Sequence, residues 1–136
     1  MSFKIRGLRN NNPGNIRIST IPWDGKVPVS QNTDGDFEQF YNAEDGIRAM
    51  ARNLLTYYNR GLDTIEKMIS TWAPSNENDT AAYIRSVSMK TGIDSKAKYP
   101  RDNIAPLVKA IIVHENGLNP YSDAVINRAI ERAGWT

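Results

Sequence analysis

A glutamate ends the most apolar helical stretch of the sequence. Apolar residues recur there at spacings of three and four, as Ile104, Leu107, Val108, Ile111 and Ile112. At about 100° per residue, position 115 lies within roughly 20° of position 104 on the same helix face. Glu115 is therefore expected to point toward the core side at the last helical turn, where the negative end of the helix dipole favours a protonated carboxyl. A general acid for glycoside cleavage needs such a group.

Two other interpretations of this helix end stay open. If the helix is rotated or frayed, Glu115 is simply in solvent. His114 lies one step off the apolar face, and a surface or capping role suits it, because a cation is favourable near a helix C-terminus. Proton transfer is the alternative role for His114.

Size and composition limit the possible classes of protein. The 136 residues suit a single domain over residues 1–136, and a content of 40% apolar residues allows an ordinary core. The chain has no cysteine and one histidine, so we expect no metal site and no organic cofactor. Because 17 basic residues face 15 acidic ones for a net charge of +2, a nucleic-acid partner is not expected.

The sequence also predicts where the protein is made. The basic start MSFKIRGLR is not followed by a signal-peptide apolar run, and no stretch approaches the roughly 18 apolar residues of a membrane span. We therefore expect synthesis in the cytoplasm without stable membrane association, and action outside would need another export route.

The elements that must position Glu115 fall into two parts. The first 41 residues look strand-like: IRIST (16–20) alternates apolar and polar residues, and TDGDFEQFY (33–41) places a turn before aromatics. These segments predict a small antiparallel sheet of two or three strands. Caps and three–four spacing then predict about five helices, within 42–61, 63–74, 78–92, 102–116 and 122–134. The expected fold class is α+β.

Several segments resemble a known family. They are RGLRNNNPGNIR (6–17), the Trp-x-Gly of residues 23–25, TDGDF (33–37), DGIRAMARNL (45–54), WAPSNENDTAAYI (72–84) and AIIVHENGLNPYSD (110–123). Together they resemble small phage and prophage proteins of the lysozyme-like superfamily. This resemblance covers most of the chain and implies a lysozyme-like fold.

A looser similarity connects the chain to autolysin glucosaminidases and soluble lytic transglycosylases. In those families a catalytic glutamate ends a helix before a small residue and glycine, and an Asn-x-x-Gly strand follows later. Here NPGNI (12–16) comes first and Glu115-Asn116-Gly117 comes near the end. The resemblance therefore implies a circularly permuted arrangement, which neighbouring termini would permit.

The resemblance implies cleavage of β-1,4 glycosidic bonds in peptidoglycan, with Glu115 protonating the leaving oxygen. Asp34 is the first choice for a second catalytic group, because it matches the family's Thr-Asp-x-x-Phe pattern. Asp36 and Glu38 are alternatives, and Asp34-Gly35 is also a turn signal by itself. A lytic transglycosylase with one glutamate, which forms anhydro ends, stays open.

Substrate contacts are expected from three further residues. Tyr83 matches a family tyrosine on a helix facing the cleft, where it would bind sugar or hold Glu115. Asn12 and Asn15 would line the sugar site, although asparagines in a Pro-Gly turn need no ligand. Glu77 is a rival acid, better suited to stabilising the start of the following helix.

The resemblance implies bacterial peptidoglycan as the partner, and we expect the protein to be a monomer. A phage endolysin (muramidase) reaching the periplasm through a holin is the first expectation, and an enzyme carried in the virion is the second. The alternative function is a catalytically inactive virion structural protein.

Overall fold

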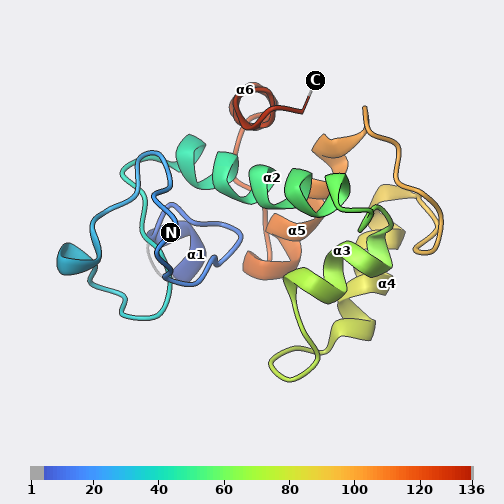
Figure 1. The fold of residues 1–136 in the computed structure, drawn as a ribbon, viewed down its shortest axis with the longest axis horizontal. Coiled ribbons are helices and arrows are strands. Elements are labelled where there is room, and N and C mark those ends of the chain that lie inside the picture. The colour runs from blue at the N-terminus through green and yellow to red at the C-terminus, as the bar shows by residue number, and fades with distance from the viewer. Residues whose placement is uncertain (1–4, 136) are drawn as a thin grey trace.

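The computed structural model describes residues 5–135, and each helix after residue 42 lies within a range that the sequence predicts (Figure 1). They are α2 Ala43–Asn59, α3 Ile65–Trp72, α4 Thr80–Thr91, α5 Ile104–Asn116 and α6 Asp123–Ala133. The two helices at the chain start are short: α1 spans Arg6–Arg9 and the 3-10 helix η2 spans Val29–Gln31.

Side-chain caps fix several of these helix starts. The side chains of Asn42, Asp79 and Ser122 each accept a hydrogen bond from a backbone N–H in the first turn of α2, α4 and α6. The Thr64 side chain caps α3 in the same way, accepting a hydrogen bond from Lys67 N–H. At the other end of α5, Gly117 has a φ of 83°, a left-handed conformation that stops the helix directly after Asn116.

The predicted sheet is wrong, and so is the α+β class. Among residues 5–135 antiparallel pairing is limited to three isolated bridges, Arg17–Phe37, Lys26–Phe40 and Thr64–Lys98, so the fold is mostly helical. Glu38 N still donates to Ile16 O, and Ile18 N to Asp36 O, but an asparagine side chain interrupts this pairing between Ile16 N and Glu38 O. The Asn12 amide donates to Ile16 O and Glu38 O and accepts from Ile16 N. The N-terminal segment is thus held as an irregular layer.

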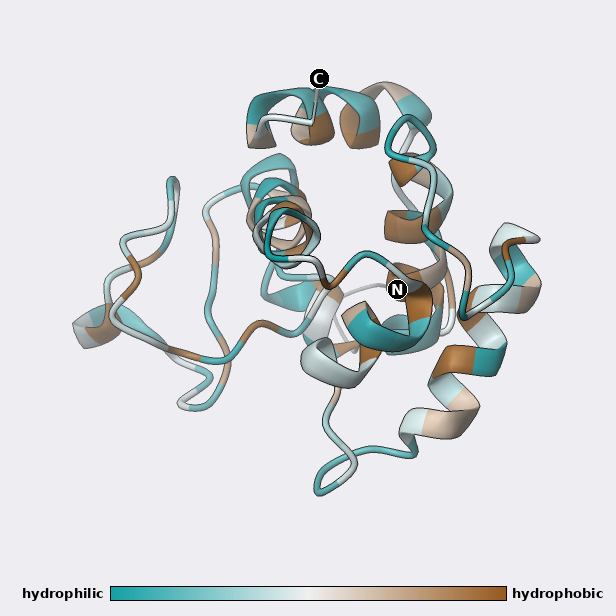
Figure 2. Cartoon of the chain, turned by 45° about the vertical axis from the view of Figure 1, so that its right-hand side comes forward, coloured by the Kyte–Doolittle hydropathy of each residue, from teal (hydrophilic) through white to brown (hydrophobic). Residues whose placement is uncertain are grey.

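The core is assembled around α5. Its apolar face is buried, and α4 and α6 pack against it, while α2 packs against α6. Figure 2 shows hydrophobic residues on the inward faces of these helices. Trp135 closes the core after α6, where its indole Nε1 donates to Ala51 O at 2.8 Å. No helix within residues 5–135 has both the length and the apolar character needed to cross a bilayer.

Two close contacts attach the N-terminal layer to the helices. The Asn116 amide at the end of α5 donates to Pro13 O at 2.8 Å, across 103 positions of sequence. At the start of α2, a Cβ on Gly46 would lie 1.8 Å from Asn11 O, so the two backbones meet where only glycine fits. These contacts place the turn at residues 12–15 over the end of α5.

Candidate active site

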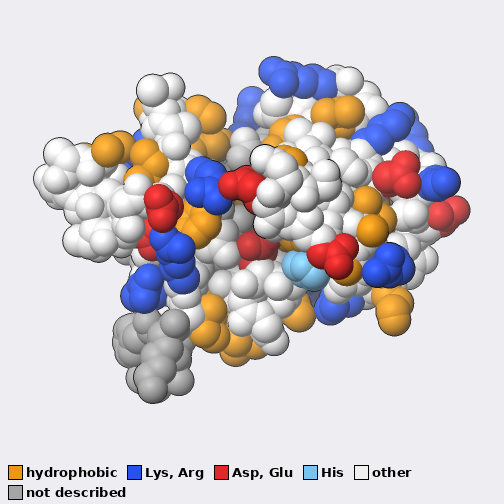
Figure 3. All heavy atoms as spheres, turned by 90° about the horizontal axis from the view of Figure 1, so that it is seen from below, with side chains coloured by type: hydrophobic (Ala, Val, Ile, Leu, Met, Phe, Trp, Pro, Cys, Tyr) orange, Lys and Arg blue, Asp and Glu red, His pale blue; other side chains and the backbone are white. Residues whose placement is uncertain are grey.

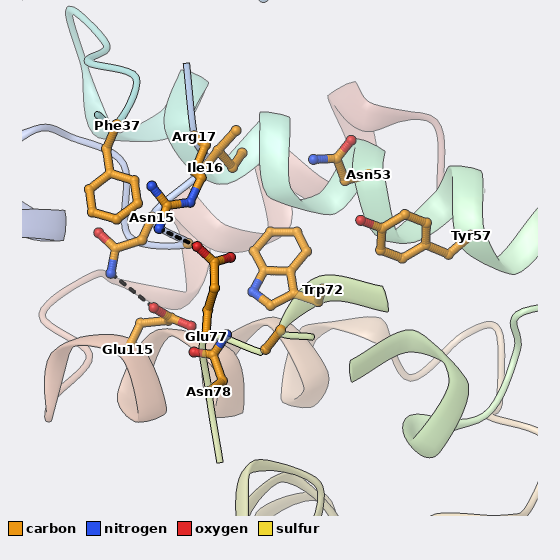
Figure 4. Close-up of a pocket in the computed structure, with 12 residues that line it drawn as sticks. Asn15, Ile16, Arg17, Phe37, Asn53, Tyr57, Trp72, Glu77, Asn78 and Glu115 are labelled. Carbon is orange, nitrogen blue, oxygen red and sulfur yellow. Dashed lines mark hydrogen bonds and ion pairs between the residues drawn. The ribbon is translucent and has the colours of Figure 1, made fainter. Parts of the chain in front are cut away.

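A cavity of about 410 Å³ lies between the N-terminal layer and the helices. Residues 14–17 and Phe37 form one wall, and α2, the end of α3, the α3–α4 loop and the end of α5 form the rest. Figure 4 shows Asn15 and Glu115 at one end, Asn53 and Tyr57 at the other, and Trp72 between them. The cavity is therefore an elongated cleft with one glutamate at its end.

The predicted phase of α5 brings Glu115 to this cleft. Ile104, Leu107 and Ile111 are buried on the core face, and Glu115 continues that face as a half-buried side chain lining the cavity. The fully solvated alternative is thereby excluded.

Two neutral donors hold the Glu115 carboxyl, one on each oxygen. Asn15 Nδ2 donates to Oε1 at 2.9 Å, and the Tyr83 hydroxyl donates to Oε2 at 2.8 Å (Figure 4 shows the first). A hydroxyl can rotate to accept as well as donate, whereas an amide N–H only donates. Glu115 can thus keep both contacts whether its carboxyl is charged or carries a proton on Oε2.

Asn15 is presented to Glu115 by a strained turn. Its φ of 51° is left-handed, and its backbone N–H donates to Asn12 O at 2.9 Å. Beside it, a Cβ on Gly14 would lie 2.7 Å from the Trp72 ring, so the turn lies flat against that indole. The predicted sugar-site residue Asn15 therefore lines the cleft and also positions Glu115.

Tyr83 lies behind Glu115 rather than in the cleft. It is only 1% exposed, and burial, followed by the charge of Glu115, holds the pKa of its hydroxyl well above the usual range. Of the two predicted roles for Tyr83, the structure supports holding Glu115.

The His114 ring stacks on the ring of Tyr83. Its ring centroid lies 3.7 Å from that of Tyr83, with the planes 25° apart. Partial burial lowers the pKa of His114, Lys90 lowers it further, and Glu115 opposes them. His114 thus covers one face of the Tyr83 ring.

The structure does not bring Asp34 to Glu115. The Asp34 side chain is 1% exposed and lies outside the cleft lining, paired with Arg6 at 2.6 Å. Asn10 Nδ2 and the backbone N–H groups of Asp36 and Phe37 also donate to it. The hydrogen bond from Arg6 is the main cause that holds the pKa of Asp34 far below its ordinary value of 3.8. Asp34 therefore fastens α1 to the 32–37 loop.

This pairing predicts an acid-dependent loss of stability. Because the folded pKa of Asp34 is depressed, its contribution is complete above the unfolded pKa near 3.8 and is lost as pH falls below it. Asp34→Asn should lower the free energy of unfolding by about 2 kcal/mol at neutral pH, and the difference from wild type should shrink as pH falls through roughly 4 to 2. Urea unfolding across this pH range measures it. Asp102→Asn, at an exposed aspartate, should leave the pH profile unchanged, and an unchanged profile for Asp34→Asn would contradict the assignment.

Three other polar candidates of the N-terminal layer lie outside the cleft. Asn12 is buried with its amide satisfied by backbone, so it does not line the cleft. Glu38 is also buried, 2.9 Å from Lys26 Nζ, and Asp36 is exposed beside Arg6. None of these three residues reaches the cavity.

Sequence reasoning missed part of the cleft. Asn53 and Tyr57 lie four positions apart on α2, beside its buried face, and Phe37 lines the opposite wall. In the sequence, the signal for Asn53 and Tyr57 was their four-residue spacing, which places two side chains that can hydrogen-bond on one helix face. In the described part of the chain, no three His, Cys, Asp or Glu side chains are grouped to hold a metal.

Comparison with known proteins gives one informative relative. No family model matches the chain. Protein P5 of Pseudoalteromonas phage PM2 is 42% identical over 130 residues, which cover 93% of this chain and 80% of the relative. The chain therefore belongs to the same family as protein P5 of Pseudoalteromonas phage PM2.

Proposed function

We propose that this protein cleaves β-1,4 glycosidic bonds in the glycan strands of peptidoglycan, with Glu115 as the general acid. The observation that carries the proposal is a half-buried glutamate at the end of an open cleft, held through both oxygens by Asn15 and Tyr83. The motif resemblance to lysozyme-like phage proteins supports the same assignment.

The reaction begins with proton transfer from Glu115 to the glycosidic oxygen while its bond to C1 breaks. The leaving sugar departs with a hydroxyl, and positive charge develops at C1 of the other sugar. Asn15 keeps the carboxyl aimed into the cleft, and the Tyr83 hydroxyl turns from acceptor to donor as Glu115 becomes negative. The same carboxylate can then take a proton from the group that attacks C1.

The attacking group decides between the two reaction types. Water attack gives hydrolysis, and attack by the sugar's own 6-hydroxyl gives the anhydro end of a lytic transglycosylase. Besides Glu115, Glu77 is the carboxylate that lines the cleft among the described residues, and it is paired with Arg17. Since Asp34 is engaged elsewhere, we place both proton transfers on Glu115.

Other cleft residues suit a carbohydrate. Trp72 and Tyr57 supply aromatic faces for sugar rings, and the amides of Asn53 and Asn78 can bond hydroxyl or acetamido groups. Basic and acidic side chains are interspersed on the face in Figure 3, which disfavours a nucleic-acid surface.

The phage relative supports a role in a phage life cycle. An endolysin reaching the periplasm through a holin, or an enzyme carried in the virion, would meet peptidoglycan. The relative's printed name, protein P5, states no activity. Its phage origin therefore favours a second candidate, a virion structural protein without catalysis.

The two candidates are separated by incubating the protein with dye-labelled purified sacculi. Release of soluble dye, above that with heat-unfolded protein, is expected of a glycan-cleaving enzyme. A folded protein that releases none supports the virion structural protein.

The hydroxyl of Tyr83 gives a further prediction. Tyr83→Phe removes the donor to Glu115 Oε2 and should lower the cleavage rate roughly tenfold and the free energy of unfolding by about 1 kcal/mol. Tyr99→Phe is the matched control, because it loses a buried hydroxyl bond to Asn103 O at the opposite end of α5. It should show a similar stability loss with an unchanged rate. Equal rates for all three proteins would remove Tyr83 from the mechanism.

A further inference from the structure

One ion pair crosses the cleft. Arg17 Nη2 lies 2.8 Å from Glu77 Oε1, and the two residues are 60 positions apart. Arg17 belongs to the N-terminal layer, and Glu77 to the loop between α3 and α4. Figure 4 shows this ion pair between the Glu115 end of the cleft and the Asn53–Tyr57 end. A glycan strand that occupies the cleft must therefore contact the ion pair.

This ion pair is easily exchanged. The side chains of Arg17 and Glu77 are 56% and 46% exposed, and exposed pairs contribute little to folding because water and salt screen them. Another carboxylate could replace Glu77 at small cost.

Arg17 has a second contact besides Glu77. Its guanidinium lies 5.0 Å from the centre of the Phe37 ring, which attracts a cation. With the described residues, its side chain makes one hydrogen bond, to Glu77, although a guanidinium has five N–H donors arranged for two-point binding of a carboxylate. The remaining donors are available at the cleft.

We propose that Arg17 recognises a carboxylate of the glycan strand, and that Glu77 occupies this position in the free protein. This inference rests on the proposed glycan substrate, and it identifies a carboxylate as the group of that substrate that Arg17 binds. Peptidoglycan carries such groups as the lactyl carboxylate of muramic acid or the carboxylates of its stem peptides. A neutral β-1,4 polymer of N-acetylglucosamine carries no carboxylate. Arg17 should therefore stay paired with Glu77 when such a polymer binds.

Binding is measured by calorimetry in the Glu115→Gln background, so that strands are not consumed. Three probes are compared: strands stripped of peptides by an amidase, which expose lactyl carboxylates; strands with stem peptides; and neutral chitohexaose. Arg17→Gln should weaken binding of the strand that bears the recognised carboxylate about tenfold and leave chitohexaose unchanged. Glu77→Gln should tighten the acidic strands about threefold by removing the competitor. Whichever acidic probe loses affinity in Arg17→Gln identifies the source of the carboxylate.

Arg85→Gln is the matched control, since Arg85 is an exposed arginine on α4 outside this cleft. It should change none of the affinities. The inference is overturned if Arg17→Gln affects acidic and neutral probes alike, or if no probe binds. Cleavage of sacculi by wild type without Arg17-dependent selectivity removes only the inference. Selective binding without cleavage removes only the catalytic proposal.

Discussion

Glu115→Gln should lower the rate of glycan cleavage by about a thousandfold and leave the fold intact. Gln has the same shape but cannot give a proton to a leaving oxygen. Its carbonyl can accept from Asn15 and its NH₂ can donate to the Tyr83 hydroxyl, so both positioning contacts survive. Dye release from sacculi gives the rate, and thermal unfolding checks the fold.

Glu131→Gln is the control for this change, because Glu131 is exposed on α6, away from the cleft. It should cleave at the wild-type rate. A Glu115→Gln protein as active as the control would remove Glu115 from the chemistry and leave Glu77 as the acid of the cleft.

Gly46→Ala should destabilise the protein by about 3 kcal/mol, which corresponds to a drop of about 10 °C in Tm. The added Cβ would lie 1.8 Å from Asn11 O, and both partners are backbone, so α2 and the 11–15 turn must separate. Helix propensity alone predicts the opposite sign, a gain of about 1 kcal/mol.

Urea unfolding measures this change, with Thr56→Ala as a control in the same helix. Thr56 is only half buried, and its replacement should shift stability by no more than about 0.5 kcal/mol. A stabilised Gly46→Ala protein would show that α2 does not meet the turn as described.

The helices could be predicted because their signals are local. Side chains of Asn42, Asp79 and Ser122 cap helices within the predicted ranges, and Gly117 ends α5. The sheet was predicted wrongly because the alternation in IRIST indicates only that one side of the segment is buried. It does not show whether the segment pairs with another strand. The Asn12 amide takes the place of one backbone bond, between Ile16 N and Glu38 O, and sequence spacing does not reveal this contact.

Some residues of the candidate site could likewise be predicted from local signals, and others depend on contacts between distant segments. Helical phase located Glu115, and the motif resemblance suggested Asn15 and Tyr83. Asp34 has the turn pattern of its motif, but its carboxylate is captured by Arg6, which no local spacing indicates. Asn53 and Tyr57 reach the cleft only because of how α2 crosses the end of α3, and that depends on packing of the whole domain.

Mass spectrometry of the products released from purified peptidoglycan tests the central claim most directly. Wild type should give fragments cut between sugars with their peptides intact, and Glu115→Gln should give none above background. Anhydro ends would assign a lytic transglycosylase, and reducing ends a hydrolase. Fragments cut in the peptides, or equal products from both proteins, would contradict glycan cleavage by Glu115.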